Sequence, residues 1–145
     1  MKFGLIAADT SRSRAYLYNL SSANMLPSET IVLTGGGNKV FGKQEKKPLN
    51  YLTDFDWPEA SFDPNEPILD IIENLGLSYT VKNVEDINEK SVIETLISSQ
   101  LSLFIFSGFG GNLLKTDTLN TKKLFLHVHG GLLPHYGGST SNYYS

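Results

Sequence analysis

The chain has 145 residues, of which 40% are hydrophobic and 19% are charged, and its formal net charge is -3. These values fit a single globular domain over residues 1–145, and the lack of cysteine excludes disulfides, thiolate metal sites and a cysteine nucleophile. The apolar stretches are too short to cross a bilayer, and the acidic balance argues against a surface built for nucleic-acid phosphates. We therefore expect a cytoplasmic protein without membrane or nucleic-acid partners, acting on a small molecule.

The first part of the chain predicts a strand, a helix and a second strand. Residues 3–8 are an apolar run, residues 9–11 can cap a helix, and apolar side chains at helical spacing follow. Residues 30–34 are β-branched and apolar, and the triple glycine 35–37 ends that strand. Residues 38–62 show no sustained period, so we expect a long surface loop there.

The middle of the chain continues the alternation. The run Asp63-Pro64-Asn65-Glu66 predicts a helix start, with a capping carboxylate and a proline at the first helical position, and Gly76 is predicted to end that helix. Residues 78–84 alternate in the manner of a strand. Asn88 is then predicted to cap the next helix.

The last part predicts two more strands. Residues 101–106 have the pattern of a buried strand, and a glycine-rich turn follows at residues 108–111. A short helix is predicted over 112–119 and a final strand over 123–129. This order predicts an α/β fold, a Rossmann-like and mostly parallel sheet with helices on both faces, in which ligands bind outside the carboxyl ends of the strands.

The turns at those strand ends do not match the common nucleotide motifs. The turn after the first strand contains no glycine, which argues against the dinucleotide fingerprint. The turn Gly108-Phe109-Gly110-Gly111-Asn112 follows a strand, but Leu113 stands where a third glycine belongs, and no phosphate-loop lysine follows. By the motif alone, a sharp turn is the simpler interpretation.

Two histidines at a strand end are a stronger signal. His127 and His129 are two residues apart, so in a strand both side chains point to one face, next to Gly130 and Gly131. Imidazoles in this place are typical of an active site. Two other interpretations stay open: a pair of packed, hydrogen-bonded histidines, and a zinc site that would include His135 but has no cysteine or nearby carboxylate.

Residues 127–138, with the sequence His-Val-His-Gly-Gly-Leu-Leu-Pro-His-Tyr-Gly-Gly, resemble the signature of the folate-dependent formyltransferases. In that signature Asn-x-His is followed by a small residue, Leu-Leu-Pro and Tyr-Arg-Gly. Residues 107–114 are similar to the family's strand-end turn that lines the pterin pocket, and Asp-Ile-Asn at 86–88 is common before a helix in the family. The element order is similar to the family's N-terminal catalytic domain along the whole chain.

The resemblance implies transfer of a formyl group from 10-formyltetrahydrofolate, the formyl donor, to a primary amine. It implies that His129 donates to the oxyanion and moves protons, and that His127 replaces the asparagine that orients the formyl oxygen; no metal ligand is expected. The residues it assigns to folate binding are Phe109, Gly110, Gly111, Asn112, Leu113, Leu132, Leu133 and Pro134.

Three departures from the family pattern affect this expectation. His127 stands in place of asparagine, Gly137 stands in place of arginine, and residues 130–145 contain no carboxylate that could be the family's downstream aspartate. We therefore expect an incomplete formyltransferase-like domain, truncated at the C-terminus and weakly active by itself. A removed orienting group in a catalytic unit commonly costs orders of magnitude in rate.

The acceptor is not fixed by the sequence. We expect a small-molecule amine such as an amino sugar nucleotide, because the acidic balance disfavours tRNA. The alternatives are a methionyl-tRNA formyltransferase, a formyltetrahydrofolate hydrolase and a catalytically inactive binding relative. A Rossmann-like domain with unrelated small-molecule binding and a homodimer of the full-length protein also stay open.

Overall fold

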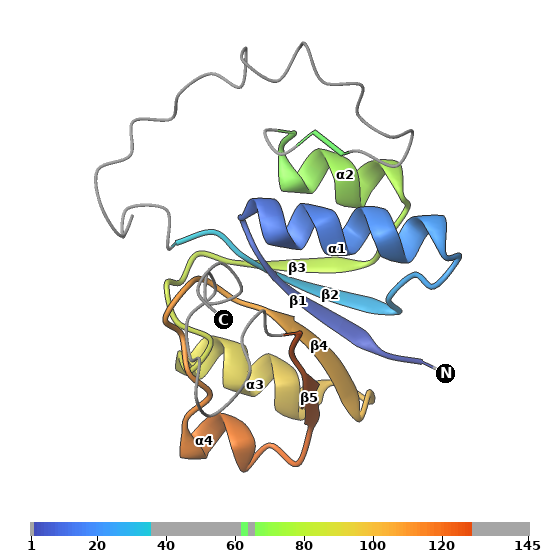
Figure 1. The fold of residues 1–145 in the computed structure, drawn as a ribbon. Helices are drawn as coiled ribbons and strands as arrows, with labels where there is room; N and C mark the ends of the chain where they lie inside the picture. Colours follow the sequence, from blue (N-terminus) through green and yellow to red (C-terminus); the bar gives the residue numbers. More distant parts are fainter. Residues whose placement is uncertain (1, 36–61, 64–65, 129–145) are drawn as a thin grey trace, which may run out of the picture.

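The computed structural model describes residues 2–35, 62–63 and 66–128. In this part of the chain, five strands form one parallel sheet in the order β3-β2-β1-β4-β5 (Figure 1). The strands are β1 (Gly4–Ala8), β2 (Glu29–Leu33), β3 (Tyr79–Lys82), β4 (Leu103–Ser107) and β5 (Leu124–Leu126), and the helices are α1 (Ser11–Ser22), α2 (Ile68–Asn74), α3 (Lys90–Ser98) and α4 (Thr116–Leu119). The expected α/β, Rossmann-like architecture is confirmed at this level.

Strand β1 lies at the centre of the sheet. All five of its residues are buried, as a parallel strand covered on both faces requires. Ile6 is in register with Ile31 of β2 on one side and with Phe106 of β4 on the other. The apolar run at the N-terminus is therefore the core strand.

Helices cover both faces of the sheet, as the alternation predicted. Helices α1 and α2 lie on one side and α3 lies on the other (Figure 1). Alternate residues of β1 face the two sides: Leu5 and Ala7 belong to the core that includes Leu17 of α1, whereas Ile6 belongs to the core that includes Leu96 of α3. Among the described segments, every helix is too short or too polar to span a bilayer.

Two of the predicted helix boundaries are confirmed. Thr10, within the expected capping segment 9–11, is the N-cap of α1, and its hydroxyl accepts the backbone N–H of Ser13 at 3.3 Å. Gly76 follows the C-terminus of α2 with a φ of +64°, the left-handed conformation that glycine adopts without steric cost.

The predicted start of α2 at residues 63–66 is wrong. The helix begins at Ile68 with Pro67 as its N-cap, and the Glu66 N–H instead donates to the Asp63 carbonyl at 3.4 Å. The second proline explains the shift, because the residue before a proline is disfavoured in the helical region and proline has no N–H for a helix interior.

Other boundaries also differ from the prediction. Asn88 does not cap α3; the N-cap is Glu89, without a side-chain cap bond, because the Asn88 side chain bonds to a distant loop. The expected helix 112–119 is reduced to α4, and the expected strand 123–129 to the three residues of β5. The expected loop at 38–62 lies outside the described residues except for Phe62.

Gly4 should be intolerant of a side chain. Gly4 of β1 is in register with Phe104 of β4, and a Cβ at Gly4 would overlap the ring of Phe104, which is fully buried. We expect Gly4→Ala to lower the free energy of unfolding by about 1–3 kcal/mol, the usual cost of overpacking, in urea denaturation. Gly110→Ala is the matched control, because nothing lies within 4 Å of its Cβ position. Equal stability of the two variants would contradict this packing.

Candidate functional site

The strand order makes the carboxyl ends of β1 and β4 the candidate ligand site. In a doubly wound sheet, ligands bind at the carboxyl ends of the strands where the strand order reverses. Here the reversal lies between β1 and β4, which are adjacent in the sheet but separated by β2 and β3 in the sequence. The turn after β1 leads into α1, and the turn after β4 is the glycine-rich segment 108–113.

A buried serine pair joins the two turns. The hydroxyl groups of Ser13 and Ser107 lie 2.8 Å apart, and the Ser13 hydroxyl also donates to the Ser107 carbonyl at 3.2 Å. Both residues are fully buried. Buried hydroxyl groups need such partners, so this pair fixes the start of α1 against the end of β4.

Two arginines at the start of α1 complete this edge. Arg12 donates from Nη2 to the Gly108 carbonyl at 2.5 Å. Arg14 is buried, and it donates to Asp9 Oδ1 and to the Glu66 carbonyl, each at 2.6 Å. Among the residues that the structure describes, no carboxylate pairs with Arg12. Arg12 therefore brings positive charge to the glycine turn, whereas Arg14 is neutralised and holds the segment before α2.

The sequence pattern assigned no role to Arg12, Ser13 or Arg14, and Ser107 was included only as the first residue of the turn 107–114. The arginines follow a helix cap and the serines are ordinary polar residues, so spacing alone gives no signal. The one available hint was that an otherwise apolar strand run ends in a serine directly before glycine.

The glycine-rich turn is compact and presents an apolar side chain. The Asn112 N–H donates to the Phe109 carbonyl at 3.2 Å, and Gly111 has a φ of +82°. Phe109 packs against the core on the α3 side. Leu113 is 78% exposed, so its side chain is available to contact a ligand.

The turn is tied to the segment that precedes α3. Asn112 donates from Nδ2 to the Glu85 carbonyl at 2.7 Å, and Lys115 pairs with Asp86 at 3.1 Å. Partial burial raises the pKa of Asp86, but hydrogen bonds from the Asn88 backbone N–H and from Lys115 outweigh it, so that the pKa lies below the usual value of an aspartate.

His127 lies beside the end of β4. Its Nδ1 is 2.8 Å from the Phe106 carbonyl, and its ring packs against the Phe106 ring with centroids 5.7 Å apart. Because a carbonyl only accepts, Nδ1 carries the proton in this bond. In the neutral ring, Nε2 is therefore an acceptor, and it becomes a donor only when the imidazole is doubly protonated.

The structure thus brings part of the predicted site together. His127 and the turn 109–113 both adjoin the end of β4 at the carboxyl edge of the sheet. The other predicted site residues, His129, Leu132, Leu133 and Pro134, lie outside the described residues, as does His135 of the zinc alternative. Within the described part of the chain, no cluster of three or more His, Cys, Asp or Glu side chains is placed to hold a metal.

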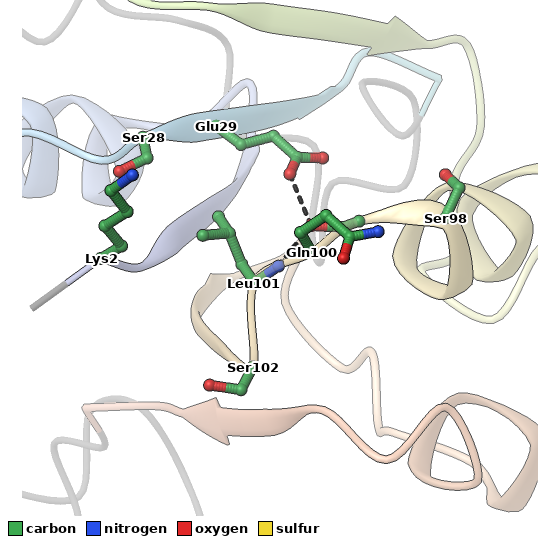
Figure 2. A pocket seen from close by; sticks show the side chains of 8 residues that line it. Lys2, Ser28, Glu29, Ser98, Gln100, Leu101 and Ser102 are labelled. Carbon is green, nitrogen blue, oxygen red and sulfur yellow. Dashed lines mark hydrogen bonds between the residues drawn. The ribbon is translucent and has the colours of Figure 1, made fainter.

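A hollow of about 570 Å³ lies at the opposite edge of the sheet, around the amino ends of β1, β2 and β4 (Figure 2). Its lining contains no histidine, and two of its polar side chains bind each other, because the Ser99 hydroxyl donates to Glu29 at 2.6 Å. The carboxyl edge combines the topological position with His127, Arg12 and the glycine turn. We therefore locate the candidate site there.

The tautomer of His127 can be measured directly. We expect the neutral ring to be protonated at Nδ1, because the Phe106 carbonyl accepts that proton. Two-bond ¹H–¹⁵N correlation spectra of the protein should give a pyrrole-type Nδ1 and a pyridine-type Nε2 for His127. A pyridine-type Nδ1 would contradict the arrangement.

Asp86 should stabilise the protein in a pH-dependent way. Because the folded-state pKa of Asp86 is depressed, its stabilisation is present at neutral pH and is lost as the pH falls below about 4, through the folded pKa. Asp86→Asn should therefore melt at a lower temperature than the wild type at pH 7, and the difference should shrink towards pH 3. Glu94→Gln removes the exposed Lys90–Glu94 pair and should have little effect at either pH. A constant difference for Asp86→Asn would contradict stabilisation by the charged carboxylate, which the Asn88 N–H and Lys115 hold.

Comparison with known proteins gives no assignment. No protein-family model matches the chain, and no curated protein is similar to it at a significant level.

Proposed function

We propose that this protein transfers a formyl group from 10-formyltetrahydrofolate to the primary amine of a small molecule. One observation supports the proposal above the others. The two motifs that resemble the formyltransferases are the turn 107–114 and the segment that starts at His127, and His127 lies 2.8 Å from the carbonyl of Phe106, the residue directly before that turn. A shared site needs the two segments to meet at one edge, and the proximity of His127 to the turn at the carboxyl ends of β4 and β5 supports this.

The turn has properties that suit a folate. A pterin ring is flat and carries polar edges, so it needs an apolar surface and backbone hydrogen-bonding groups. Leu113 offers exposed apolar surface, and the peptide groups of Gly110 and Gly111 have no side chain of their own to shield them. By the resemblance, Leu132, Leu133 and Pro134 form the neighbouring wall.

The reaction needs stabilisation of an oxyanion and transfer of a proton. The amine nitrogen attacks the formyl carbon, a C–N bond forms, and the carbonyl electron pair moves to oxygen. The bond to N10 of the folate then breaks, and a proton passes from the attacking nitrogen to N10. His129 is assigned the oxyanion and proton-transfer role by resemblance.

His127 differs chemically from the asparagine it replaces. An asparagine amide donates a hydrogen bond at any pH, whereas Nε2 of His127 donates only from the doubly protonated ring, because Nδ1–H is bound to the Phe106 carbonyl. His127 can therefore take the place of that asparagine as a donor only in its doubly protonated form.

The acceptor and the reaction class can be tested in one assay. We expect tetrahydrofolate to form from 10-formyltetrahydrofolate when the protein is mixed with a nucleotide-linked amino sugar, and to form at a lower rate with methionyl-tRNA, because the net charge is -3. His129→Ala should lower the rate by at least about 100-fold. Formation of formate without any amine would assign a hydrolase, and no turnover with any amine would contradict the proposal.

Two substitutions in the same assay test His127. His127→Asn should retain turnover because its amide is a donor, whereas His127→Ala should lower the rate because it leaves no polar group for the formyl oxygen. Equal rates of the wild type and His127→Ala would exclude His127 as the group that orients the formyl oxygen.

A further inference from the structure

We propose that Asn88 is a positioning residue that holds the glycine-rich turn and the residues after it, 109–115, in the geometry that binds folate. The inference rests on the proposed function for the identity of the ligand. The tie itself rests on contacts between two segments far apart in the sequence, the β3–α3 connection and the β4–α4 connection.

The side-chain amide of Asn88 makes all four hydrogen bonds of which it is capable. Nδ2 donates to the Leu113 carbonyl at 2.8 Å and to Asp86 Oδ1 at 2.5 Å. Oδ1 accepts the Lys115 N–H at 2.8 Å and the Thr118 hydroxyl at 2.7 Å. An asparagine has two donor hydrogens and two acceptor positions, and the opposite orientation of the amide would place its donors against an N–H.

The hydrogen bonds of Asn88 hold a loop, residues 108–115, that has no regular secondary structure of its own. Residues 108–115 contain neither helix nor strand, and they include two consecutive glycines. The following helix α4 has four residues, and its N-cap Lys115 makes no side-chain cap bond. Asn88 therefore accepts, from another segment, the N–H of the N-cap residue Lys115, which the third helical residue accepts in a capping box.

The other ties between the two segments are single bonds. The Lys115 side chain that pairs with Asp86 is 68% exposed, and exposed ion pairs contribute little. Asn112 makes one bond to the Glu85 carbonyl, and this bond is exposed, as are the bonds of Asn88 to Leu113 and Lys115. Asn88 differs because it contacts the backbone on both sides of Leu114, so its loss should release the turn more than the loss of either other tie.

The bond between Asn88 and the Leu113 carbonyl affects ligand binding through the Leu113 side chain. Its carbonyl is held by Asn88 while its side chain is 78% exposed. The bond thus fixes the direction of the apolar surface that the proposed function assigns to the pterin. Releasing the carbonyl leaves that side chain without a defined direction, which lowers affinity through the cost of ordering it on binding.

The test combines amide hydrogen exchange with calorimetry, using the wild type, Asn88→Ala, Asn88→Asp and the control Asn19→Ala. Asn19 is an exposed asparagine on α1 whose side chain donates to the Ala15 carbonyl of its own helix. Exchange of the Lys115 amide is measured without ligand, and the affinity is measured for 5-formyltetrahydrofolate. Thermal melts confirm that each variant is folded at the temperature used.

We expect Asn88→Ala to speed exchange of the Lys115 amide and to weaken binding about tenfold or more, the effect of losing one or two hydrogen bonds. Asn88→Asp loses both donors and sets a second carboxylate against Asp86 and the Leu113 carbonyl, so it should also release the loop and weaken binding. Asn19→Ala should match the wild type in both measurements. A merely destabilised protein would lower the fraction of chains that bind and would expose many amides, whereas the proposal predicts a change confined to the loop.

Two results would overturn the proposal. Unchanged exchange of the Lys115 amide in Asn88→Ala would show that Asn88 does not hold the loop, and unchanged affinity with faster exchange would show that the held geometry is irrelevant to binding. Failure of the wild type to bind 5-formyltetrahydrofolate would overturn the proposed function and the folate part of this inference. The exchange measurement, made without ligand, would still decide whether Asn88 holds the loop.

Discussion

The parallel pairing of β1 with β4 is the constraint on which the rest of the structure depends. β1 is buried on both faces, and β4 reaches it only after the chain has passed through α3, on the face of the sheet opposite α1 and α2 (Figure 1). This reversal produces two separate cores, one on each face. It also brings the turns after β1 and β4 together at the carboxyl edge, where sheets of this topology bind their ligands.

That edge is held by a small number of polar contacts that cross between segments. Ser13 binds Ser107, Arg12 binds the Gly108 carbonyl, and His127 binds the Phe106 carbonyl. Each contact involves a residue at or next to the end of β4. The glycine turn that follows is free of regular structure, and its position depends on side chains from the β3–α3 connection, with Asn88 as the central one.

The layers of the fold could be predicted from the sequence, but the polar contacts between distant segments could not. Apolar runs and their spacing predicted the strands, the helices on both faces and the two helix boundaries at Thr10 and Gly76, because burial and backbone conformation leave local patterns. The predicted start of α2 at 63–66 was wrong, because Pro67 disfavours helical conformation in the residue before it and has no N–H for a helix interior. Asn88 was predicted to cap α3, but its side chain bonds to Leu113 and Lys115 instead of to the first turn of that helix. The serine pair leaves no periodic signal, since its members lie 94 residues apart.

The central claim is that the carboxyl edge, with the glycine turn and His127, is the folate site. Titration of the ¹⁵N-labelled protein with 5-formyltetrahydrofolate tests this claim most directly, because amide chemical shifts report binding residue by residue. The account predicts shift changes centred on residues 108–115 and on His127, with no change around the hollow at Glu29 and Ser99 (Figure 2). Changes centred on that hollow, or none at all, would contradict the account.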